Sequence, residues 1–146
     1  FETLSPGLQR TLEGMRAVHG SAHIFGKGGV NDKNPEGASR YANHELVGAD
    51  VVHPVVIKHP LSGRKALYVN RGFTTRILGV PRDESDAILR YLYEHMESPL
   101  WQVRFRWREN SIAFWDNRAV LHLAAGTPDH LRRKLYRTTI EGDRPF

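Results

Sequence analysis

Strict alternation of apolar and polar residues is clearest near the start of the C-terminal third of the chain. Apolar side chains stand there at every second position and polar ones fill the gaps: Trp101, Val103, Phe105 and Trp107 alternate with Gln102, Arg104 and Arg106. A period of two predicts a strand with one buried face. Glu109 and Asn110 then predict a turn into a second strand, from Ser111 to Trp115.

Two more strands are expected downstream, one running through the stretch 115–124 and one over 132–140, with a turn at 126–129 between them. If alternation holds, the two strands present the following residues on one face each: Val120, His122 and Ala124, then Arg133, Leu135, Arg137 and Thr139. His122 and the two arginines would then line one cavity. Imidazole binds iron, zinc and copper, and guanidinium grips carboxylates, sulfonates and phosphates, so the pattern predicts a metal beside an anion.

Each of these residues also has a plainer interpretation. A lone histidine among valine, leucine and alanine is more often a satisfied core residue than a ligand. Arg133 and Arg137 could equally be solvated charges on an edge strand, although Leu135 between them argues for partial burial.

Helical periodicity appears in two places. Ser5 followed by Pro6 predicts a helix start, and the apolar residues Leu8, Leu12, Met15 and Val18 predict that the helix continues to about Gly20. A second helix is predicted from Glu84 to Met96, capped by Asp83. Its apolar stripe, formed by Ile88, Leu89, Leu92 and Met96, is expected to cover a sheet.

The region between the two helices divides into a loop and a hairpin. Residues 21–48 have no sustained period and many glycines, so we expect a mobile loop, either an active-site lid or a disordered segment. Val51–Lys58 and Lys65–Val69 are rich in β-formers and flank the turn Pro60-Leu61-Ser62-Gly63, which predicts a hairpin. Its prolines favour an edge position.

Composition narrows the possible classes of protein. A length of 146 residues fits one domain, and 40% hydrophobic with 25% charged residues fits an ordinary globular chain without membrane spans. The net charge of +5 comes from scattered Lys and Arg, which favours small anionic ligands over nucleic acid. The absence of cysteine excludes disulfides and thiolate metal sites. No signal peptide is visible at the start, and we expect a cytoplasmic protein.

No second metal ligand emerges from the remaining histidines. The one His-x-Glu triplet, His95 to Glu97, lies at the end of a predicted helix, where residues two apart point about 200° apart and do not chelate one ion. We assign no chemistry to five further histidines, which lie in the hairpin or beside or in the loop: His19, His23, His44, His53 and His59.

With these residues assembled, the chain resembles the taurine dioxygenase family, the TauD/TfdA group of iron(II)- and 2-oxoglutarate-dependent dioxygenases. The resemblance runs from Leu4 to Phe146 and is densest in three segments: His53-Pro54-Val55-Val56 with His59-Pro60 and Ser62-Gly63; Val69 to Ile77; and Trp115-Asp116-Asn117-Arg118 with His122, Arg133, Arg137 and Gly142-Asp143. Several separate motifs occur in the right order.

The resemblance implies a fold and a set of roles. The fold would be a mainly β double-stranded β-helix, or jelly roll, with flanking helices. His122 matches the distal histidine of a two-histidine, one-carboxylate iron site. Arg133 matches the arginine that binds the far carboxylate of the cosubstrate 2-oxoglutarate. Arg137 matches the arginine that faces the substrate sulfonate, and Phe73 matches an aromatic wall of the substrate pocket.

Two departures from the family pattern stand out. The early His-x-Asp pair and the residues that read the taurine amine belong to a half of the family fold that this chain does not contain. We therefore expect residues 1–146 to be the C-terminal portion of one dioxygenase domain with an incomplete jelly roll, either a fragment or a truncated homologue. Where taurine dioxygenase has another pocket phenylalanine, this chain reads His19-Gly20-Ser21, with Phe25 nearby, which leaves the exact substrate open.

The resemblance implies that 2-oxoglutarate and O2 are consumed while a small anionic substrate is hydroxylated. A sulfonate such as taurine would then release sulfite. Alternatives within the family are an alkyl sulfate or an aryloxyalkanoate. Outside enzymology, the chain could be a truncated, non-catalytic anion-binding or interaction domain. A homo-oligomer is a family expectation, and we expect no nucleic-acid or membrane partner.

Overall fold

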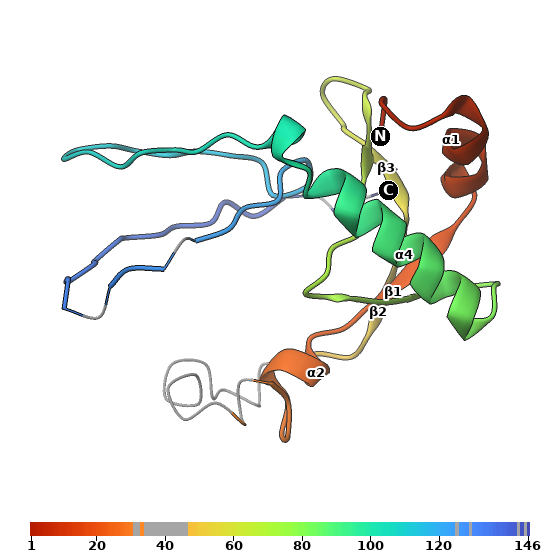
Figure 1. The fold of residues 1–146 in the computed structure, drawn as a ribbon, viewed down its shortest axis with the longest axis horizontal. Coiled ribbons are helices and arrows are strands. Elements are labelled where there is room, and N and C mark those ends of the chain that lie inside the picture. The colour runs from red at the N-terminus through yellow and green to blue at the C-terminus, as the bar shows by residue number, and fades with distance from the viewer. Residues whose placement is uncertain (31–32, 34–46, 125, 129, 143, 145) are drawn as a thin grey trace.

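The computed structural model describes residues 1–146 except 31–32, 34–46, 125, 129, 143 and 145. The described chain has two parts (Figure 1). A packed body contains its helices and strands up to Trp101, and two long excursions project from one side of that body. We call these excursions the first arm, 102–115, and the second arm, the described residues of 119–142.

Helix α1 (Pro6–Glu13) begins where the sequence predicts. The Ser5 Oγ accepts a hydrogen bond from the Leu8 amide at 3.4 Å, and Pro6 occupies the first turn. The predicted extension to Gly20 is wrong, because the helix ends at Gly14 and strand β1 (Arg16–His19) follows. Val18 therefore belongs to a strand, and the apolar spacing that suggested a longer helix continues across the break by coincidence.

Strand β1 is the centre of a three-stranded antiparallel sheet in the order β2-β1-β5. Strand β2 (Val51–Pro54) pairs Val51 with His19, and strand β5 (Thr74–Ile77) pairs Ile77 with Ala17. The β1–β5 register shifts between Val18 and His19, so the sheet is irregular at that histidine. The prediction that the proline-containing strand lies at an edge is confirmed for β2.

The predicted hairpin is confirmed in a shorter form. Strands β3 (Val56–Lys58) and β4 (Lys65–Leu67) pair antiparallel, with Val56 opposite Leu67 and Lys58 opposite Lys65. Gly63 in the connecting turn has φ of 70°, a conformation that glycine adopts without strain. Val55 separates β3 from β2 and is fully buried.

Helix α4 (Arg82–Met96) covers the sheet, as predicted (Figure 1). Its buried residues Leu89, Leu92 and Tyr93 join Ile77, Ala17 and Leu12 in one hydrophobic core. Asp83 lies in the first turn but does not cap it, since Pro81 is the N-cap and no side chain bonds there, so that detail was wrong. No described helix is long and apolar enough to cross a membrane.

Two side chains of α4 form hydrogen bonds with the backbone of strand β5. The Ser85 Oγ accepts a hydrogen bond from the Ile77 amide at 2.8 Å, and Ser85 is only 1% exposed. The Tyr93 hydroxyl donates to the Thr74 carbonyl at 3.2 Å. These two bonds fix how α4 lies against β5.

The predicted strands beyond Trp101 are wrong for the described residues. A short 3-10 helix, η2 (Pro99–Trp101), follows α4, and no described residue after it belongs to a strand. The arms are extended, with a turn at Glu109 and Asn110 as predicted, but no backbone ladder pairs their described residues. A strand needs a neighbour for its amides and carbonyls, and the described residues provide none here.

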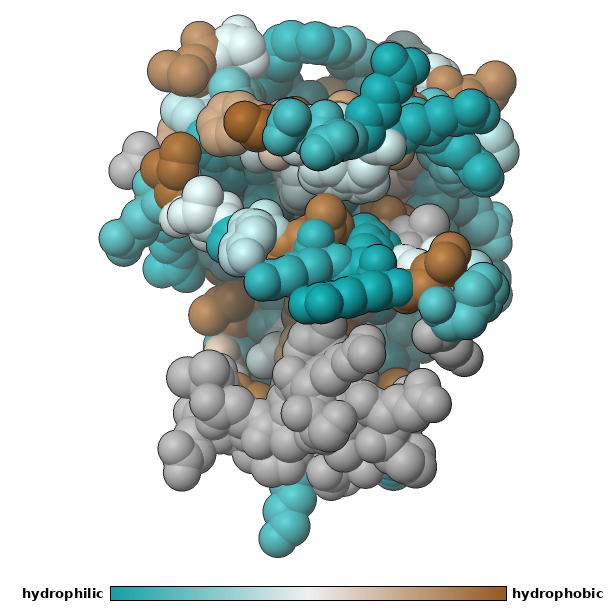
Figure 2. Space-filling model, turned by 90° about the vertical axis from the view of Figure 1, so that its left-hand side faces the viewer, coloured by the Kyte–Doolittle hydropathy of each residue, from teal (hydrophilic) through white to brown (hydrophobic). Residues whose placement is uncertain are grey.

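The apolar residues of the arms are consequently exposed. Val103 is 91%, Phe105 54% and Trp107 45% exposed. Figure 2, which looks onto the side from which the arms project, shows apolar side chains scattered among polar ones. The expected jelly roll is not seen as such: the described residues form two small sheets with flanking helices, and they close no barrel.

The predicted loop 21–48 is described only in part. It begins with a short helix, α2 (Ala22–Phe25). Residues 31–32 and 34–46 lie outside the described residues, so the prediction of a lid is not tested there.

Candidate functional site

The three residues predicted to bind iron and two anions all lie on the second arm. His122, Arg133 and Arg137 are exposed and belong to extended backbone without strand pairing. The common face that paired strands would give them is therefore not formed. The ring of His122 lies against that of Trp115, with centroids 4.9 Å apart and planes inclined at 49°. The roles of all three residues remain predictions.

Phe73, the predicted wall of a substrate pocket, sits in a tight turn before β5. The Asn70 Oδ1 accepts a hydrogen bond from the Phe73 amide at 2.7 Å, and the Thr74 Oγ1 accepts one from the Asn70 amide at 2.9 Å. The Phe73 carbonyl accepts from the Gly20 amide at 2.9 Å, which ties the turn to the end of β1. Phe73 is held in place by its backbone, while 41% of its surface stays exposed.

Helix α2 brings a second phenylalanine to the same place. His23 Nε2 donates a hydrogen bond to the Gly72 carbonyl at 2.9 Å, which fixes α2 against the turn. The ring of Phe25 stacks on that of Phe73, with centroids 6.2 Å apart and planes inclined at 30°. The phenylalanine that is displaced in the sequence relative to the family pattern therefore still contacts Phe73.

A cavity of about 260 Å³ opens beside these residues. Its lining combines an aromatic side chain from the turn with polar groups from β1, β2 and the segment after β4: Phe73, Asn70, His19, His53 and Tyr68, with Ser21 nearby. A concave surface that combines an aromatic side chain with several polar groups can hold a small molecule.

Two histidines that line this cavity pack against each other and against Tyr68. The ring centroids of His19 and His53 are 5.4 Å apart, and those of His19 and Tyr68 are 5.6 Å apart. His19 is only 8% exposed, its Nδ1 lies 3.3 Å from the Thr74 hydroxyl, and its Nε2 has no hydrogen-bond partner among the described residues. Burial, helped by the neighbouring His53, lowers the pKa of His19 to about 4, so the ring is neutral at physiological pH.

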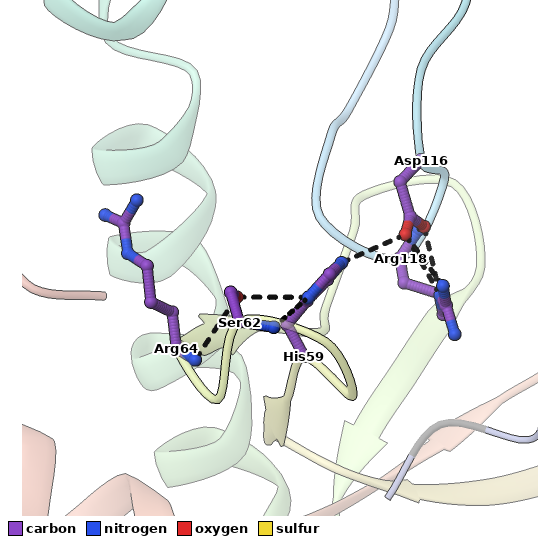
Figure 3. Close-up of polar contacts among 5 residues, drawn as sticks. All are labelled: His59, Ser62, Arg64, Asp116 and Arg118. Carbon is purple, nitrogen blue, oxygen red and sulfur yellow. Dashed lines mark hydrogen bonds and ion pairs between the residues drawn. The ribbon is translucent and has the colours of Figure 1, made fainter.

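A second polar group joins the body to the start of the second arm (Figure 3). His59, in the turn after β3, approaches Asp116 with 3.2 Å between Nε2 and Oδ2. Arg118 donates to the same carboxylate from its backbone amide at 2.9 Å, from Nε at 3.0 Å and from a terminal nitrogen at 2.8 Å. Arg118, with a smaller contribution from His59, holds the pKa of Asp116 well below its usual range.

The donor set for a metal is incomplete in this part of the chain. An exposed imidazole such as that of His122 suits iron(II) as one nitrogen ligand. The described residues contain no cluster of three or more His, Cys, Asp or Glu side chains that could hold an ion. The described residues therefore do not make up a complete metal site, and His122 stays a predicted ligand.

Sequence reasoning gave no role to His19, His53 or His59, and the structure places all three at polar sites. His19 and His53 become neighbours because β1 pairs with β2, putting His19 opposite Val51 and His53 opposite Ala17. That pairing is not visible in either segment alone. The available signal was the segment from His53 to Gly63, which carried part of the family resemblance.

Comparison with known proteins gives a consistent result. The sequence model described as "Taurine catabolism dioxygenase TauD, TfdA family" matches residues 1–139. The chain is 41% identical to a putative alpha-ketoglutarate-dependent sulfonate dioxygenase of Schizosaccharomyces pombe, over 100% of this chain and 35% of that protein. It is 37% identical to an alpha-ketoglutarate-dependent sulfate ester dioxygenase of Pseudomonas putida, over 99% of this chain and 48% of that protein.

A solved structure resembles the described fold as well. The crystal structure of a taurine dioxygenase from Burkholderia xenovorans superposes with a TM-score of 0.61 and 36% identity, over 81% of this chain and 34% of that chain. This chain thus spans between 34% and 48% of the length of these three proteins.

Proposed function

Since the chain belongs to the TauD/TfdA family of taurine catabolism dioxygenases, we propose that it is the C-terminal portion of an iron(II)- and 2-oxoglutarate-dependent dioxygenase. Its substrate is a small anionic organic molecule. The cavity beside Phe73 supports this proposal, because Phe73, which the family resemblance assigns to the substrate pocket, lines that cavity and has Phe25 stacked on it.

Three residues of the second arm have separate tasks in this proposal. His122 holds the metal through one imidazole nitrogen. Arg133 binds the far carboxylate of 2-oxoglutarate, and Arg137 binds the anionic group of the substrate, both through paired guanidinium hydrogen bonds. Bound iron supplies the oxygen chemistry that couples decarboxylation of 2-oxoglutarate to succinate with hydroxylation of a substrate C–H bond.

The proposed substrate class is a sulfonate, with taurine as one candidate. The S. pombe relative is named as a putative sulfonate dioxygenase, and Arg137 suits a sulfonate oxygen pair. An alkyl sulfate is the second candidate, because the P. putida relative is named as a sulfate ester dioxygenase. Hydroxylation of the carbon that bears the sulfonate releases sulfite, so a sulfite-release screen separates sulfonates from alkyl sulfates and aryloxyalkanoates, which release no sulfite.

The proposal is tested by two substitutions in the complete protein. His122→Ala should abolish iron-dependent turnover of 2-oxoglutarate, because one of the metal ligands is lost. Arg137→Ala should raise the KM for the anionic substrate by at least about tenfold and leave the KM for the cosubstrate nearly unchanged. Arg90→Ala, on the exposed side of α4, is the matched control.

Two results would overturn the proposal. Substantial turnover in the His122→Ala variant contradicts the metal assignment. Equal losses for the anionic substrate and the cosubstrate in the Arg137→Ala variant contradict the division of tasks between the two arginines.

A further inference from the structure

The turn that carries His59 is itself well fixed. The His59 amide donates to the Arg64 carbonyl at 2.8 Å, and the His59 carbonyl accepts from the Gly63 amide at 2.9 Å. The preceding strand residues Val56 and Ile57 are buried. His59 is therefore attached to the body through a closed hairpin and has little freedom to follow the arms.

The hydrogen bonds of the His59 ring determine its tautomer. The Ser62 backbone amide lies 3.1 Å from Nδ1 and can only donate, so Nδ1 must accept and carries no proton. The Ser62 hydroxyl lies 3.0 Å from the same nitrogen and can donate as well. In the neutral ring the proton is then on Nε2, which points at the Asp116 carboxylate (Figure 3).

Asp116 is the centre of the next turn. Its carboxylate accepts hydrogen bonds from Arg118, and its carbonyl accepts from the amides of Ala119 and Val120, both at 3.1 Å. Side chain and backbone of Asp116 together close the turn 116–119. Figure 1 shows this turn where the first arm returns to the body and the second arm leaves it.

The turn continues directly into the segment with the predicted iron ligand. Trp115, the residue before Asp116, packs its ring against His122 at 4.9 Å, and its indole nitrogen donates to the Asn117 Oδ1 at 2.8 Å. A displacement of Asp116 therefore moves both the backbone that leads to His122 and the ring that lies against it.

We infer that His59 is a positioning residue: its Nε2–H holds Asp116 and thereby fixes the segment that presents His122 to the metal. This inference rests on the proposed function, because it assumes that His122 is a ligand. Only 22% of the His59 side chain and 33% of the Asp116 side chain are exposed. Among the described residues, the other ion pairs between distant segments are more open to solvent: Arg64 with Glu2 at 70% and 58%, Arg71 with Glu97 at 57% and 44%, and Lys65 with Glu13 at 46% and 40%. A half-buried bond within a network constrains geometry better than an exposed pair.

The two ring nitrogens of His59 allow a sharp test in the complete protein. His59→Gln places an amide N–H near Nε2 and keeps the donor to Asp116. His59→Asn places its carbonyl oxygen near Nδ1, keeps the acceptor for Ser62 and loses the donor. The measurement is the dissociation constant of iron(II) by anaerobic titration, together with the melting temperature without metal. The same two substitutions at His95, which bonds Thr3 instead, are the matched control.

We expect His59→Asn to weaken iron(II) binding by about tenfold or more, the usual range for residues that orient a metal ligand, and His59→Gln to bind nearly as tightly as the unaltered protein. A merely structural role would make iron affinity follow the loss in melting temperature, without selective recovery in the Gln variant. Equal iron affinity in the Asn and Gln variants overturns the inference.

His122→Ala, measured in parallel, separates this inference from the proposed function. If His122→Ala leaves iron binding unchanged, the metal assignment fails and the positioning role fails with it. If His122→Ala removes iron binding while His59→Asn does not weaken it, the proposed function stands and the positioning role alone is wrong.

Discussion

The rings of Phe25 and Phe73 stack with their centroids 6.2 Å apart, although one residue ends helix α2 and the other precedes strand β5. The hydrogen bond from His23 to the Gly72 carbonyl holds the two elements together. Phe25 therefore supports Phe73 from the side and extends the apolar surface that leads to the cavity.

Removal of either ring should weaken binding of the organic substrate. In the complete protein we expect Phe25→Ala and Phe73→Ala each to raise the KM for that substrate by about five- to tenfold, because an aromatic pair and its buried area are lost. The KM for the cosubstrate should stay the same. Tyr91→Ala, on the half-exposed side of α4, is the control. A parallel rise in both KM values would place the pair outside the substrate pocket.

Acid should destabilise the fold through His19. The pKa of His19 is about 4 in the folded protein and about 6.5 when unfolded, so the ring is neutral in both states above pH 6.5. As pH falls from 6.5 to 4, His19 becomes protonated in the unfolded chain but stays largely neutral in the folded protein. The free energy of unfolding should then fall by roughly 3 kcal/mol over this window.

Urea unfolding at several pH values measures this loss. His19→Phe keeps a ring and removes the titration, so its free energy of unfolding should vary much less between pH 6.5 and 4. An unchanged pH dependence in His19→Phe would show that other groups cause it.

Ser85 should contribute to stability through a single hydrogen bond. Ser85→Ala leaves the buried Ile77 amide without its acceptor, and we expect a loss of about 1–3 kcal/mol in the free energy of unfolding. Glu84→Ala, one residue earlier and exposed, should change it by less than about 0.5 kcal/mol. A loss in Ser85→Ala no larger than in Glu84→Ala would mean that water replaces the hydroxyl.

Elements whose signals are local were predictable from the sequence. The turn Pro60 to Gly63 needs a residue that tolerates positive φ, and Gly63 supplies it, so the β3–β4 hairpin was found. Helix α4 repeats its apolar residues at helical spacing over fifteen residues, which leaves little ambiguity.

Strand β1 could not be found in the same way. The strand has only four residues, and over so short a segment the position of Val18 fits both a helical and an extended pattern. Whether this segment forms a helix or a strand is decided by β2 and β5. These strands lie far along the chain and supply the hydrogen bonds on both edges of β1. The cluster of His19 and His53 was missed for the same reason, since it exists only after that pairing.

The arms show the opposite case, in which a clear alternating pattern is not accompanied by a strand among the described residues. Alternation from Trp101 to Trp107 marks which side chains suit a buried face, but it does not say what covers them. The described residues contain no neighbouring strand or layer for that face, so the pattern remains without the structure it usually accompanies.

The central place of β1 also has a consequence for the order of folding. Strand β1 lies early in the chain, whereas its partner β5 ends only at Ile77. During synthesis, the edge of β1 that pairs with β5 cannot form its hydrogen bonds until Ile77 has left the ribosome. The long loops between these strands must close, which costs conformational entropy, before the contacts that compensate for this cost can form. Assembly of this sheet should therefore be slow compared with the formation of α4.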